Sequence, residues 1–361
     1  MTVLSIKPII YLFTTTAIFL NSILLALAKF SIQIPFTSYI LITPHIFSII
    51  IYYACLFVIN YTYSVYNIEK LMLSSLQRRI IAKVNTLKNK ICKISKTKII
   101  VLICVLLFIA KIVEWLPNNL RIYFIDVGQG DSCLILTPYN KSILIDGGGS
   151  ENNNGYDIGK QVLLPYLLDR RIKKIDYLII SHFDTDHVGG LLTVMNELKV
   201  GQVIISKQKE DSENYKEFKK IAKNKKIKIK VVNKGDILKI EHDIYFNILW
   251  PNNERLISEN ALNNNSIVCK LHYKDFSMLF TGDIEEIAEQ QILREYKNNL
   301  NLLASTILKV GHHGSKTSST QGFLNIVKPK IALIGVGEKN KFGHPDDDVI
   351  KKLENMRNKN L

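Results

Sequence analysis

The chain has 361 residues, 47% of them hydrophobic, and a formal net charge of +15 at pH 7. This length leaves room for about two domains of ordinary size. Residues 1–116 hold 12 basic and 2 acidic residues, so about two thirds of the excess charge belongs to the N-terminal part. The net charge therefore does not by itself indicate a nucleic-acid-binding protein, and the five cysteines lack the paired spacing of a zinc site.

Three long apolar runs occupy the N-terminal part, from Ile9 to Phe30, from Ile34 to Ile59 and from Ile99 to Val113. Each is close to the roughly 20 residues that a helix needs to cross a bilayer. We therefore expect a membrane region at residues 1–116, with three transmembrane helices at about 9–30, 34–60 and 99–116. For the third run, a buried helix or strand of the following domain is the alternative.

The charge between the second and third runs predicts the orientation in the membrane. The loop at about 67–98 carries nine basic residues against one acid, Glu69, which is typical of a cytoplasmic loop. Counting forward, the domain at 117–361 is expected on the extracytoplasmic side of a multi-pass protein of the cell membrane. The basic loop also makes anionic membrane lipid an expected partner.

From Arg121 onward, short strands and helices follow one another. The first half of this domain is expected to contain strands at 121–126, 132–137, 141–146, 175–180, 202–206 and 228–232, with helices at 157–170 and 214–223. The second half is expected to contain strands at 244–249, 266–273, 276–281, 306–310 and 331–335, with helices at 284–296, at 321–327 and from 345. Two such mixed halves predict an α/β fold in which two sheets pack together with helices outside.

Two other patterns in this domain leave alternatives open. Cys133 and Cys269 fall on different expected strands, and the sequence does not decide whether they form a disulfide. The basic segment at 216–239 fits a solvated helix face followed by an edge strand better than a track for a phosphate backbone.

The stretch Ser181–Gly190 carries the strongest indication of chemistry. It places four potential metal ligands, His182, Asp184, Asp186 and His187, within six residues between an expected strand and an expected helix. Alternate residues of an extended segment lie on the same side, so His182, Asp184 and Asp186 are expected to converge. His187 is then expected at the turn into the helix. A polar loop with structural histidines is the alternative.

Two later segments complete the expected ligand set. Asp283 follows an apolar strand and is expected to bridge two cations, with the N-cap of a helix beginning at Ile284 as the alternative. His312 and His313 diverge if their segment is extended, so only one of them is expected to ligate, and the sequence does not say which. Two divalent cations, zinc or manganese, are the expected cofactors, and the extra carboxylate favours manganese.

Three further aspartates are expected to support the site. Asp146 precedes three glycines and is expected to orient a ligand histidine, with a simple turn residue as the alternative. Asp126 and Asp131 are expected to shape the first hairpin, whose glycine turn could also offer N–H groups to an anion.

The Ser181–Gly190 stretch resembles the His-x-His/Asp-x-Asp-His signature of the metallo-β-lactamase fold. Six further motifs resemble, in order, the outer domain of the ComEC family of DNA-uptake channels, at 124–132, 144–148, 264–266, 279–283, 308–315 and 343–345. The resemblance covers about residues 119–357 and implies an αββα sandwich preceded by transmembrane helices. It also implies metal-dependent hydrolysis of DNA during uptake, with single-stranded DNA and other competence or channel proteins as partners.

The resemblance also implies roles for single residues. His182, Asp184, Asp283 and one of the His312–His313 pair are implied metal ligands, together with Asp186 and His187. The implied catalytic residues are Asp186, His187 and His344, of which His344 either orients the scissile phosphate or begins a turn. Substrate contacts are implied for Ser315 and Lys316, which end the histidine motif.

Two departures from the family leave other functions open. Three candidate spans are too few for the family's channel, so the chain is expected to be truncated or split. Asn263–Asn265 stands where lactamase-type relatives have another histidine ligand, which is expected to leave one cation weakly held. The alternatives are hydrolysis of another substrate, such as a lactam or thioester, or a non-catalytic role as a DNA-binding or assembly partner of a separate channel.

Overall fold

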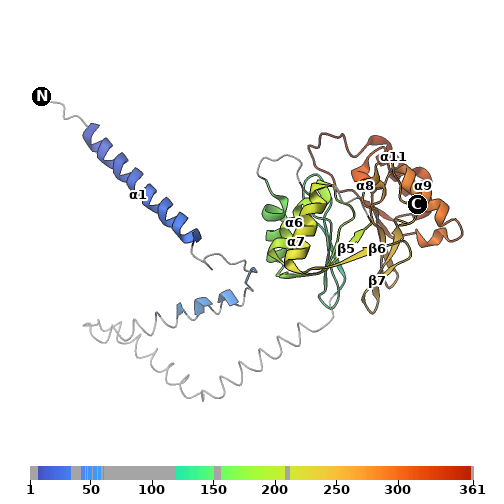
Figure 1. Ribbon diagram of the computed structural model, residues 1–361, viewed down its shortest axis with the longest axis horizontal. Helices are drawn as coiled ribbons and strands as arrows, with labels where there is room; N and C mark the ends of the chain where they lie inside the picture. The colour runs from blue at the N-terminus through green and yellow to red at the C-terminus, as the bar shows by residue number, and fades with distance from the viewer. Residues whose placement is uncertain are drawn as a thin grey trace, which may run out of the picture. The chain divides into compact units, whose positions relative to one another are not determined.

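The computed structural model describes residues 7–33, short pieces between 42 and 60, and residues 119–149, 156–207 and 212–358. The chain divides into two compact units, Met1–Ile42 and Thr43–Leu361 (Figure 1). The expected loop at about 67–98 and the expected third span at about 99–116 lie outside the described residues, and the second span is described only in pieces. These parts of the membrane region remain predictions.

The first unit contains one long helix, α1 (Lys7–Gln33). Its stretch Phe13–Phe30 has a mean hydropathy of 1.5, and none of it is buried. At 1.5 Å per residue a helix of this size is about 40 Å long, which exceeds the roughly 30 Å of a bilayer's hydrocarbon core. Among the described residues, α1 is the one helix whose length and composition allow it to cross a membrane. It overlaps the first expected span.

The second unit is built on two six-stranded sheets. Sheet A has the order β1-β2-β3-β4-β5-β6, in which β1 to β3 are antiparallel neighbours and β3 to β6 are parallel. Its strands are β1 (Arg121–Phe124), β2 (Cys133–Leu136), β3 (Ser142–Ile145), β4 (Lys174–Ile179), β5 (Lys199–Ser206) and β6 (Lys228–Val232).

Sheet B repeats this plan in the order β12-β11-β10-β9-β8-β7. Strands β7 to β10 are antiparallel neighbours, and β10 to β12 are parallel. Its strands are β7 (Ile237–Glu241), β8 (Ile244–Trp250), β9 (Val268–Tyr273), β10 (Phe276–Phe280), β11 (Ile307–Lys309) and β12 (Ile331–Leu333).

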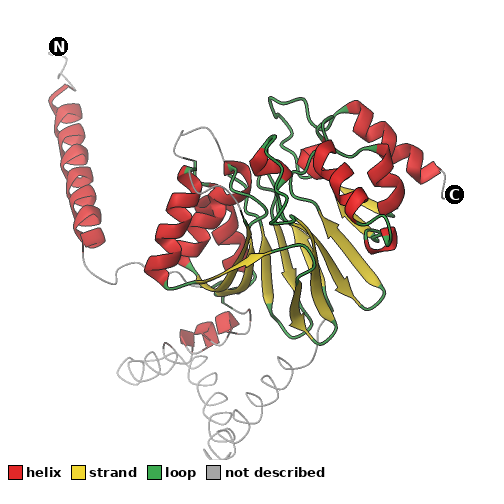
Figure 2. Ribbon diagram, turned by 45° about the vertical axis from the view of Figure 1, so that its right-hand side comes forward, coloured by secondary structure: helices red, strands yellow, loops and turns green. Residues whose placement is uncertain are grey.

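Alternation along the strands divides the interior into three cores. In β2, Cys133 and Ile135 join the core between the two sheets, whereas Leu134 and Leu136 join the core under the helices, because successive side chains point to opposite faces. Figure 2 shows helices on the outer faces of the paired sheets. The expected αββα sandwich is therefore confirmed.

The helices divide between the two sheets. Those over sheet A are η1 (Gly159–Leu163), α5 (Leu164–Asp169), α6 (Thr185–Glu197) and α7 (Glu213–Lys225). Those over sheet B are α9 (Glu286–Glu295), α10 (Gln321–Val327) and α11 (Asp347–Asn358). Short helical turns complete the unit at α8 (Ala261–Asn264), η2 (Leu300–Leu302) and η3 (Gly311–Gly314).

Two elements differ from the expectation. Strand β7 was not predicted: its buried residues Leu238 and Ile240 do alternate, but the apolar and exposed Ile237 beside Leu238 hides the alternation in the sequence of this five-residue strand. Helix α6 begins at Thr185, two residues before His187, where the turn into the helix was expected. Its first turn carries polar residues that serve the site described below, so no apolar periodicity marks it.

The two cysteines of the domain are free thiols. Cys133 and Cys269 are both buried in the core between the sheets. Burial raises the pKa of both thiols. The question that the sequence left open is thereby answered against a disulfide.

The glycines that follow β3 fix the start of helix α6. Gly147 N–H donates to the carbonyl of His187 over 2.7 Å, and Gly190 N–H donates to the carbonyl of Gly148 over 2.8 Å. A Cβ added at Gly190 would lie 2.2 Å from the Gly147 oxygen, so the two backbones are in contact. The first turn of α6, which carries Asp186 and His187, is held in this way against the end of sheet A.

Replacing Gly190 by alanine tests this packing. Alanine favours a helix over glycine by about 1 kcal/mol, but the clash with Gly147 is expected to lower the free energy of unfolding by about 1–3 kcal/mol. In the matched helical variant Gly322→Ala, the nearest heavy atom to the new Cβ is 3.9 Å away, so stability is expected to stay equal or rise. Thermal unfolding of both variants measures the difference, and equal midpoints would contradict the contact.

Candidate metal centre

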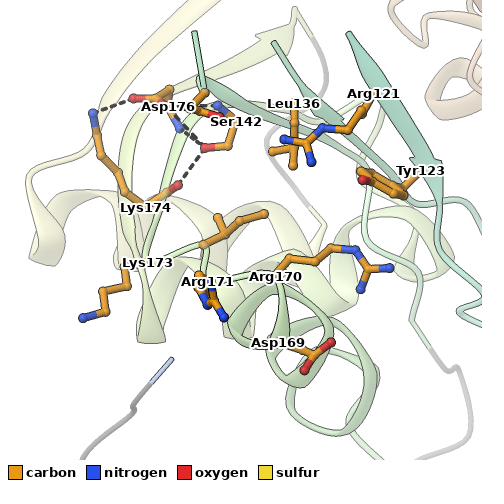
Figure 3. Close-up of a pocket in the computed structure, with 12 residues that line it drawn as sticks. Arg121, Tyr123, Leu136, Ser142, Asp169, Arg170, Arg171, Lys173, Lys174 and Asp176 are labelled. Atoms are coloured by element: carbon orange, nitrogen blue, oxygen red, sulfur yellow. Dashed lines mark hydrogen bonds and ion pairs between the residues drawn. The ribbon is translucent and has the colours of Figure 1, made fainter. Parts of the chain in front are cut away.

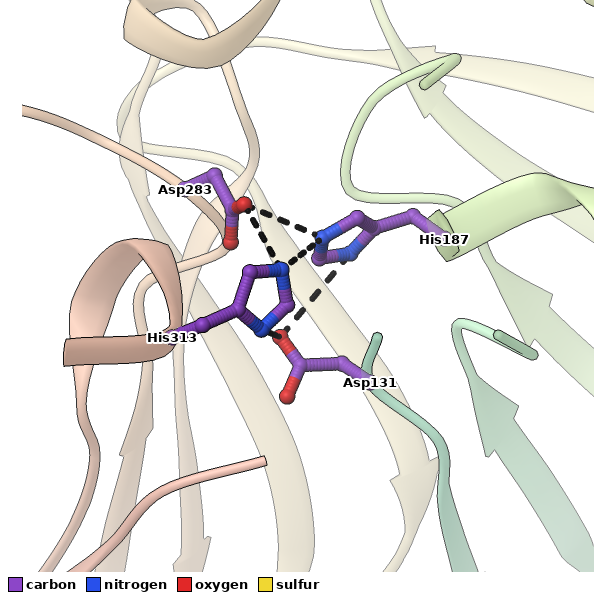
Figure 4. Close-up of side chains that lie close together, drawn as sticks. All are labelled: Asp131, His187, Asp283 and His313. Carbon is purple, nitrogen blue, oxygen red and sulfur yellow. Dashed lines mark hydrogen bonds and ion pairs between the residues drawn. The ribbon is translucent and has the colours of Figure 1, made fainter. Parts of the chain in front are cut away.

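Polar side chains from five segments meet at one end of the two sheets. Asp131 precedes β2, Asp146 follows β3, His187 lies in the first turn of α6, Asp283 follows β10 and His313 follows β11. Parallel strands bring their carboxyl ends to the same edge, so segments far apart in the sequence converge there. Figure 4 shows four of these side chains pointing toward one another in a buried cluster.

Possible ligand atoms of Asp186, His187, Asp283 and His313 lie close together at this place. His313 Nε2 is 3.1 Å from Asp283 Oδ2 and 3.2 Å from Asp186 Oδ2. His187 Nε2 is 3.2 Å from Asp283 Oδ2 and 3.3 Å from His313 Nε2. Ligands about 2.0–2.1 Å from a tetrahedral cation are about 3.3–3.4 Å apart. These four residues, called the inner set below, therefore fit a divalent cation.

Both histidines of the inner set have a hydrogen-bond partner at Nδ1, the ring nitrogen on the far side from the Nε2 contacts of the inner set. His187 Nδ1 is 3.0 Å from Asp146 Oδ2, and His313 Nδ1 is 2.7 Å from the carbonyl oxygen of Gly335. A proton on Nδ1 satisfies each contact and leaves the Nε2 lone pair facing the cluster. Asp146 is fixed in turn by the Ser181 N–H, which donates to Oδ1 over 2.8 Å. Asp146 therefore lies where a histidine-orienting acid is expected.

Lys309, at the end of β11, compensates part of the buried negative charge. Its amine forms ion pairs with Asp131 and, at 3.3 Å, with Asp283 Oδ1. Burial alone would lower the pKa of Lys309, but the two carboxylates outweigh that effect and raise the pKa, so the amine stays protonated. Because Oδ1 of Asp283 faces Lys309, only Oδ2 remains for a cation. Bridging of two cations by Asp283 would have to use that one oxygen.

The sequence interpretation missed both partners of this ion pair. Asp131 was expected to shape the first hairpin, but it is 6% exposed, and its Oδ2 lies 3.9 Å from His187 Nδ1 and 3.8 Å from His313 Nδ1. Asp131 pairs with Lys309 and also offers a carboxylate oxygen to a buried group of four possible ligands, with His187, Asp283 and His313, whose ligand atoms all lie within 4.8 Å of one another. The sequence did contain an indication of this ion pair: Lys309 lies inside the apolar run 307–310, where a charged side chain needs a buried partner.

The charges of the cluster favour cations. Burial alone would lower the pKa of both histidines, but Asp283 and the other carboxylates outweigh it, raising the pKa of His187 well above its usual value and that of His313 to about 10. The same histidines hold the pKa of Asp283 well below its usual value despite its burial. Protons on the histidines, or a divalent cation that replaces them, therefore balance the carboxylates. The carboxylates are Asp131, Asp146, Asp186 and Asp283.

His182 and Asp184 form a separate pair beside the inner set. Asp184 is the N-cap residue of α6, so the expected extended run as far as Asp186 was wrong: the chain turns helical at Thr185 and carries Asp186 into the inner set. His182 Nε2 lies 3.5 Å from Asp184 Oδ2. This nitrogen is buried and has no hydrogen-bond partner among the described residues. An unsatisfied buried nitrogen is costly, and a second cation at this pair would satisfy it.

The adjacent histidines separate because of their backbone. His312 (φ 47°) and His313 (φ 54°) are both left-handed within η3, so the expectation of an extended segment was wrong. The two rings still separate: their centroids are 6.3 Å apart, and the angle between the ring planes is 62°. His313 joins the inner set, whereas His312 Nε2 lies 3.4 Å from Asn263 Nδ2. Asn263 Oδ1 is buried without a hydrogen-bond partner among the described residues.

The remaining expected residues divide between the site and its frame. Helix α9 begins at Glu286 with Glu285 as its N-cap, which excludes Asp283 from that capping role. Ser315 is 4% exposed and its hydroxyl is 3.1 Å from Thr317 Oγ1, so its placement fits holding the loop better than the expected contact with substrate. Lys316 is exposed beside it, and the His344 ring lies 5.9 Å from that of His312.

A pocket of about 790 Å³ lies at the opposite end of β3 and β4, where these strands begin (Figure 3). Lys174 pairs there with Asp176 at 2.6 Å, and the Arg170 guanidinium lies 3.6 Å from the centre of the Tyr166 ring. No member of the inner set lines this pocket, so it is not part of the candidate metal centre. Its basic side chains are Arg121, Arg170, Arg171, Lys173 and Lys174.

Comparison with known proteins places this domain in a family. A family model described as the metallo-beta-lactamase superfamily matches residues 125–338. ComE operon protein 3 of Bacillus subtilis is 31% identical over 261 residues, which cover 70% of this chain and 33% of that protein. Recombination protein 2 of Haemophilus influenzae is 32% identical over 233 residues, which cover 64% of this chain and 26% of that protein.

Competence protein ComA of Neisseria gonorrhoeae is 28% identical over 233 residues, which cover 64% of this chain and 29% of that protein. The chain thus spans about a third or less of the length of these relatives. The family match covers more than half of the chain and includes every segment of the inner set. The chain therefore belongs to the metallo-β-lactamase superfamily, and its resemblance to ComEC-type competence proteins is confirmed.

Proposed function

We propose that this chain is a membrane-anchored, metal-dependent hydrolase that cleaves DNA phosphodiesters during DNA uptake. The observation that carries the proposal is the inner set, in which four distances between ligand atoms are 3.1–3.3 Å and both histidines are oriented by contacts to Nδ1. The names of the relatives, a recombination protein and a competence protein, support DNA as the substrate. Other competence or channel proteins are the proposed partners.

The residues of the centre are assigned complementary roles. The inner set holds one cation, and His182 with Asp184 holds a second, with manganese preferred because carboxylates are numerous. Bound cations supply Lewis-acid stabilisation of the phosphate charge and lower the pKa of water. Asp146 keeps His187 in the tautomer that ligates, and Lys309 keeps Asp283 ionised.

Two residues are assigned to the substrate. His344 orients the scissile phosphate: burial, with His312 and His313 adding to it, lowers the pKa of His344, so the neutral ring can donate a hydrogen bond without adding charge. Lys316 is exposed at the end of the histidine motif and attracts the backbone of the substrate.

Residues 1–116 are proposed to anchor the domain in the membrane. Helix α1 is long and apolar enough to cross a bilayer. Arg121 follows the third expected span by five residues, which reach at most about 18 Å. The basic pocket that Arg121 lines would therefore lie near the membrane surface, and anionic lipid is the proposed partner of the basic loop at about 67–98 on the other side.

The 361-residue chain, purified in detergent, is expected to degrade single-stranded DNA with Mn²⁺ and to lose this activity after chelation. The double variant Asp186→Ala, His187→Ala removes two ligands of the inner set. Loss of the residue that hydrogen-bonds a ligand histidine lowers metal affinity or activity by about 10–100-fold. Loss of two ligands is therefore expected to lower the activity by more than about 100-fold. The control His242→Ala changes an exposed histidine of the β7–β8 turn and is expected to be neutral. Intact activity in the double variant would refute the assignment.

The same preparation separates the alternative functions. Turnover of lactam or thioester substrates without cleavage of DNA would indicate another hydrolase of the superfamily. Absence of bound metal by mass spectrometry, together with binding of DNA, would indicate a non-catalytic partner of a separate channel.

Asp146→Asn keeps the shape of the side chain and removes its charge. The amide accepts the His187 Nδ1 proton less strongly, so the affinity for Mn²⁺ or Zn²⁺ is expected to fall about 10–100-fold. Metal titration of the purified protein measures this change. Asp126→Asn is the matched control, because Asp126 accepts only the Gly128 N–H of the first turn, over 3.0 Å, among the described contacts. Equal affinities in the wild type and Asp146→Asn would contradict the orienting role.

The predicted topology is tested with Cys92, which lies in the basic loop. A membrane-impermeant maleimide applied to intact cells is expected to leave Cys92 unlabelled until the membrane is permeabilised. The Cys92→Ser variant provides the background, since Cys133 and Cys269 are buried. Tyr139→Cys, at a position 65% exposed in the C-terminal domain, is expected to react without permeabilisation. The reverse pattern would place the domain on the cytoplasmic side.

A further inference from the structure

A pocket of about 380 Å³ adjoins the candidate metal centre and shares Asp186 with it. Its other walls come from the 127–129 loop before β2, from Tyr156 and Ile158 ahead of η1, and from residues 339–342 between β12 and α11. The volume falls within the roughly 300–1,000 Å³ of small-ligand sites. A ligand bound here would lie directly beside residues proposed to hold the metal.

The side chains of this pocket match a single nucleotide. Tyr156 and Phe342 are each 50% exposed, although large aromatic side chains are mostly buried on folding. Lys339 and Lys341 are also exposed, and Lys341 Nζ lies 5.3 Å from the centre of the Phe342 ring. Proteins bind single-stranded nucleic acid with this combination, because bases stack on the rings and phosphates attract the cations.

The loop that carries Phe342 is ordered by its own hydrogen bonds. The Asn340 side chain donates to the carbonyls of Gly337 and His344 over 2.9 and 2.7 Å. It accepts from the N–H groups of Phe342 and His344 over 3.1 and 3.0 Å. The N–H of Gly337 donates to Gln129 Oε1 over 3.1 Å, which ties the loop to the opposite wall. A loop whose backbone is fixed in advance loses little conformational entropy on binding, and this favours affinity.

A row of rings connects Phe342 to the metal centre. Phe342 stacks on His344 with centroids 5.8 Å apart and an interplanar angle of 19°. His344 meets the His312 ring at 5.9 Å, edge to face, and His312 neighbours His313 of the inner set. A base stacked on the exposed face of Phe342 would thus extend a row of rings that ends at His313 of the inner set.

We propose that this pocket is a nucleotide subsite of the same centre, in which an unpaired base stacks on Phe342 while Lys339 and Lys341 attract the adjoining phosphates. The inference rests on the proposed nuclease function and adds to it a binding site for one unpaired base of single-stranded DNA. In a duplex the face of each base is covered by its neighbours, so a base must leave the stack before it can reach this ring.

Binding of two oligonucleotides tests the stacking. The 361-residue chain in detergent, with EDTA to prevent cleavage, is titrated with fluorescent oligo-dT and with an abasic oligonucleotide of the same length and charge. The wild type is expected to bind oligo-dT roughly 5–100-fold more tightly, the range that stacking of one base provides. Phe342→Ala is expected to abolish this preference without weakening abasic binding, and Phe342→Trp is expected to retain it. Tyr139→Ala, an exposed aromatic outside the pocket, is the control.

Salt dependence tests the lysines separately. The double variant Lys339→Ala, Lys341→Ala is expected to reduce the slope of log affinity against log salt by about 1.4 for both oligonucleotides, since each phosphate contact on a single strand contributes about 0.7. An unchanged slope would remove the lysines from the subsite.

The outcomes distinguish the subsite from the function on which it rests. Bis(p-nitrophenyl) phosphate, a diester without a base, reports hydrolysis at the centre alone when Mn²⁺ is added. Base-dependent binding without hydrolysis of this diester or of DNA would refute the nuclease and support the subsite. Equal oligo-dT affinity in Phe342→Ala and wild type, or no binding of either oligonucleotide by the wild type, would overturn the subsite whatever the activity.

Discussion

The ion pair between Lys309 and Asp131 joins the two sheets of the sandwich where the candidate metal centre lies. Lys309 belongs to sheet B, and Asp131 leads into sheet A. Both groups are buried, and breaking a buried pair by removing one partner costs about 3–5 kcal/mol, because the other charge is left uncompensated. The same amine also pairs with Asp283 Oδ1. One lysine therefore links the two sheets at this end and contacts an expected metal ligand.

The surrounding fold supplies the rest of the geometry. Glycines 147–149 let the backbone after β3 touch the first turn of α6, which places His187 within 3.0 Å of Asp146. The left-handed turn of η3 points His313, and not His312, at the inner set. Each feature uses a backbone conformation or a close contact to hold a side chain before any ligand binds. Such preorganisation is what a metal centre requires.

Much of the fold follows from local patterns. Apolar alternation and turn residues predicted most of the strands, and strand-to-helix order predicted the layered sandwich. The pattern did not predict strand β7, which lies at the edge of sheet B and has only two buried side chains. It also did not predict the start of α6, whose first turn is polar because it carries residues of the site. Asp131 was assigned to a hairpin because aspartate is common in turns. The sequence does not show whether an aspartate is exposed in a turn or buried beside a lysine.

The sequence by itself determined the chemistry available to this protein: the ligand types, their order and the acid that faces a ligand histidine. Only the tertiary structure decided which of them meet. It separates the ligands that follow β4 into the pair His182 and Asp184 and the inner-set residues Asp186 and His187. It also selects His313 over His312 and brings Lys339, Lys341 and Phe342 to a pocket beside Asp186. The physical reason is that convergence depends on strand pairing and backbone turns between distant segments, whereas spacing along the chain reports only local neighbours.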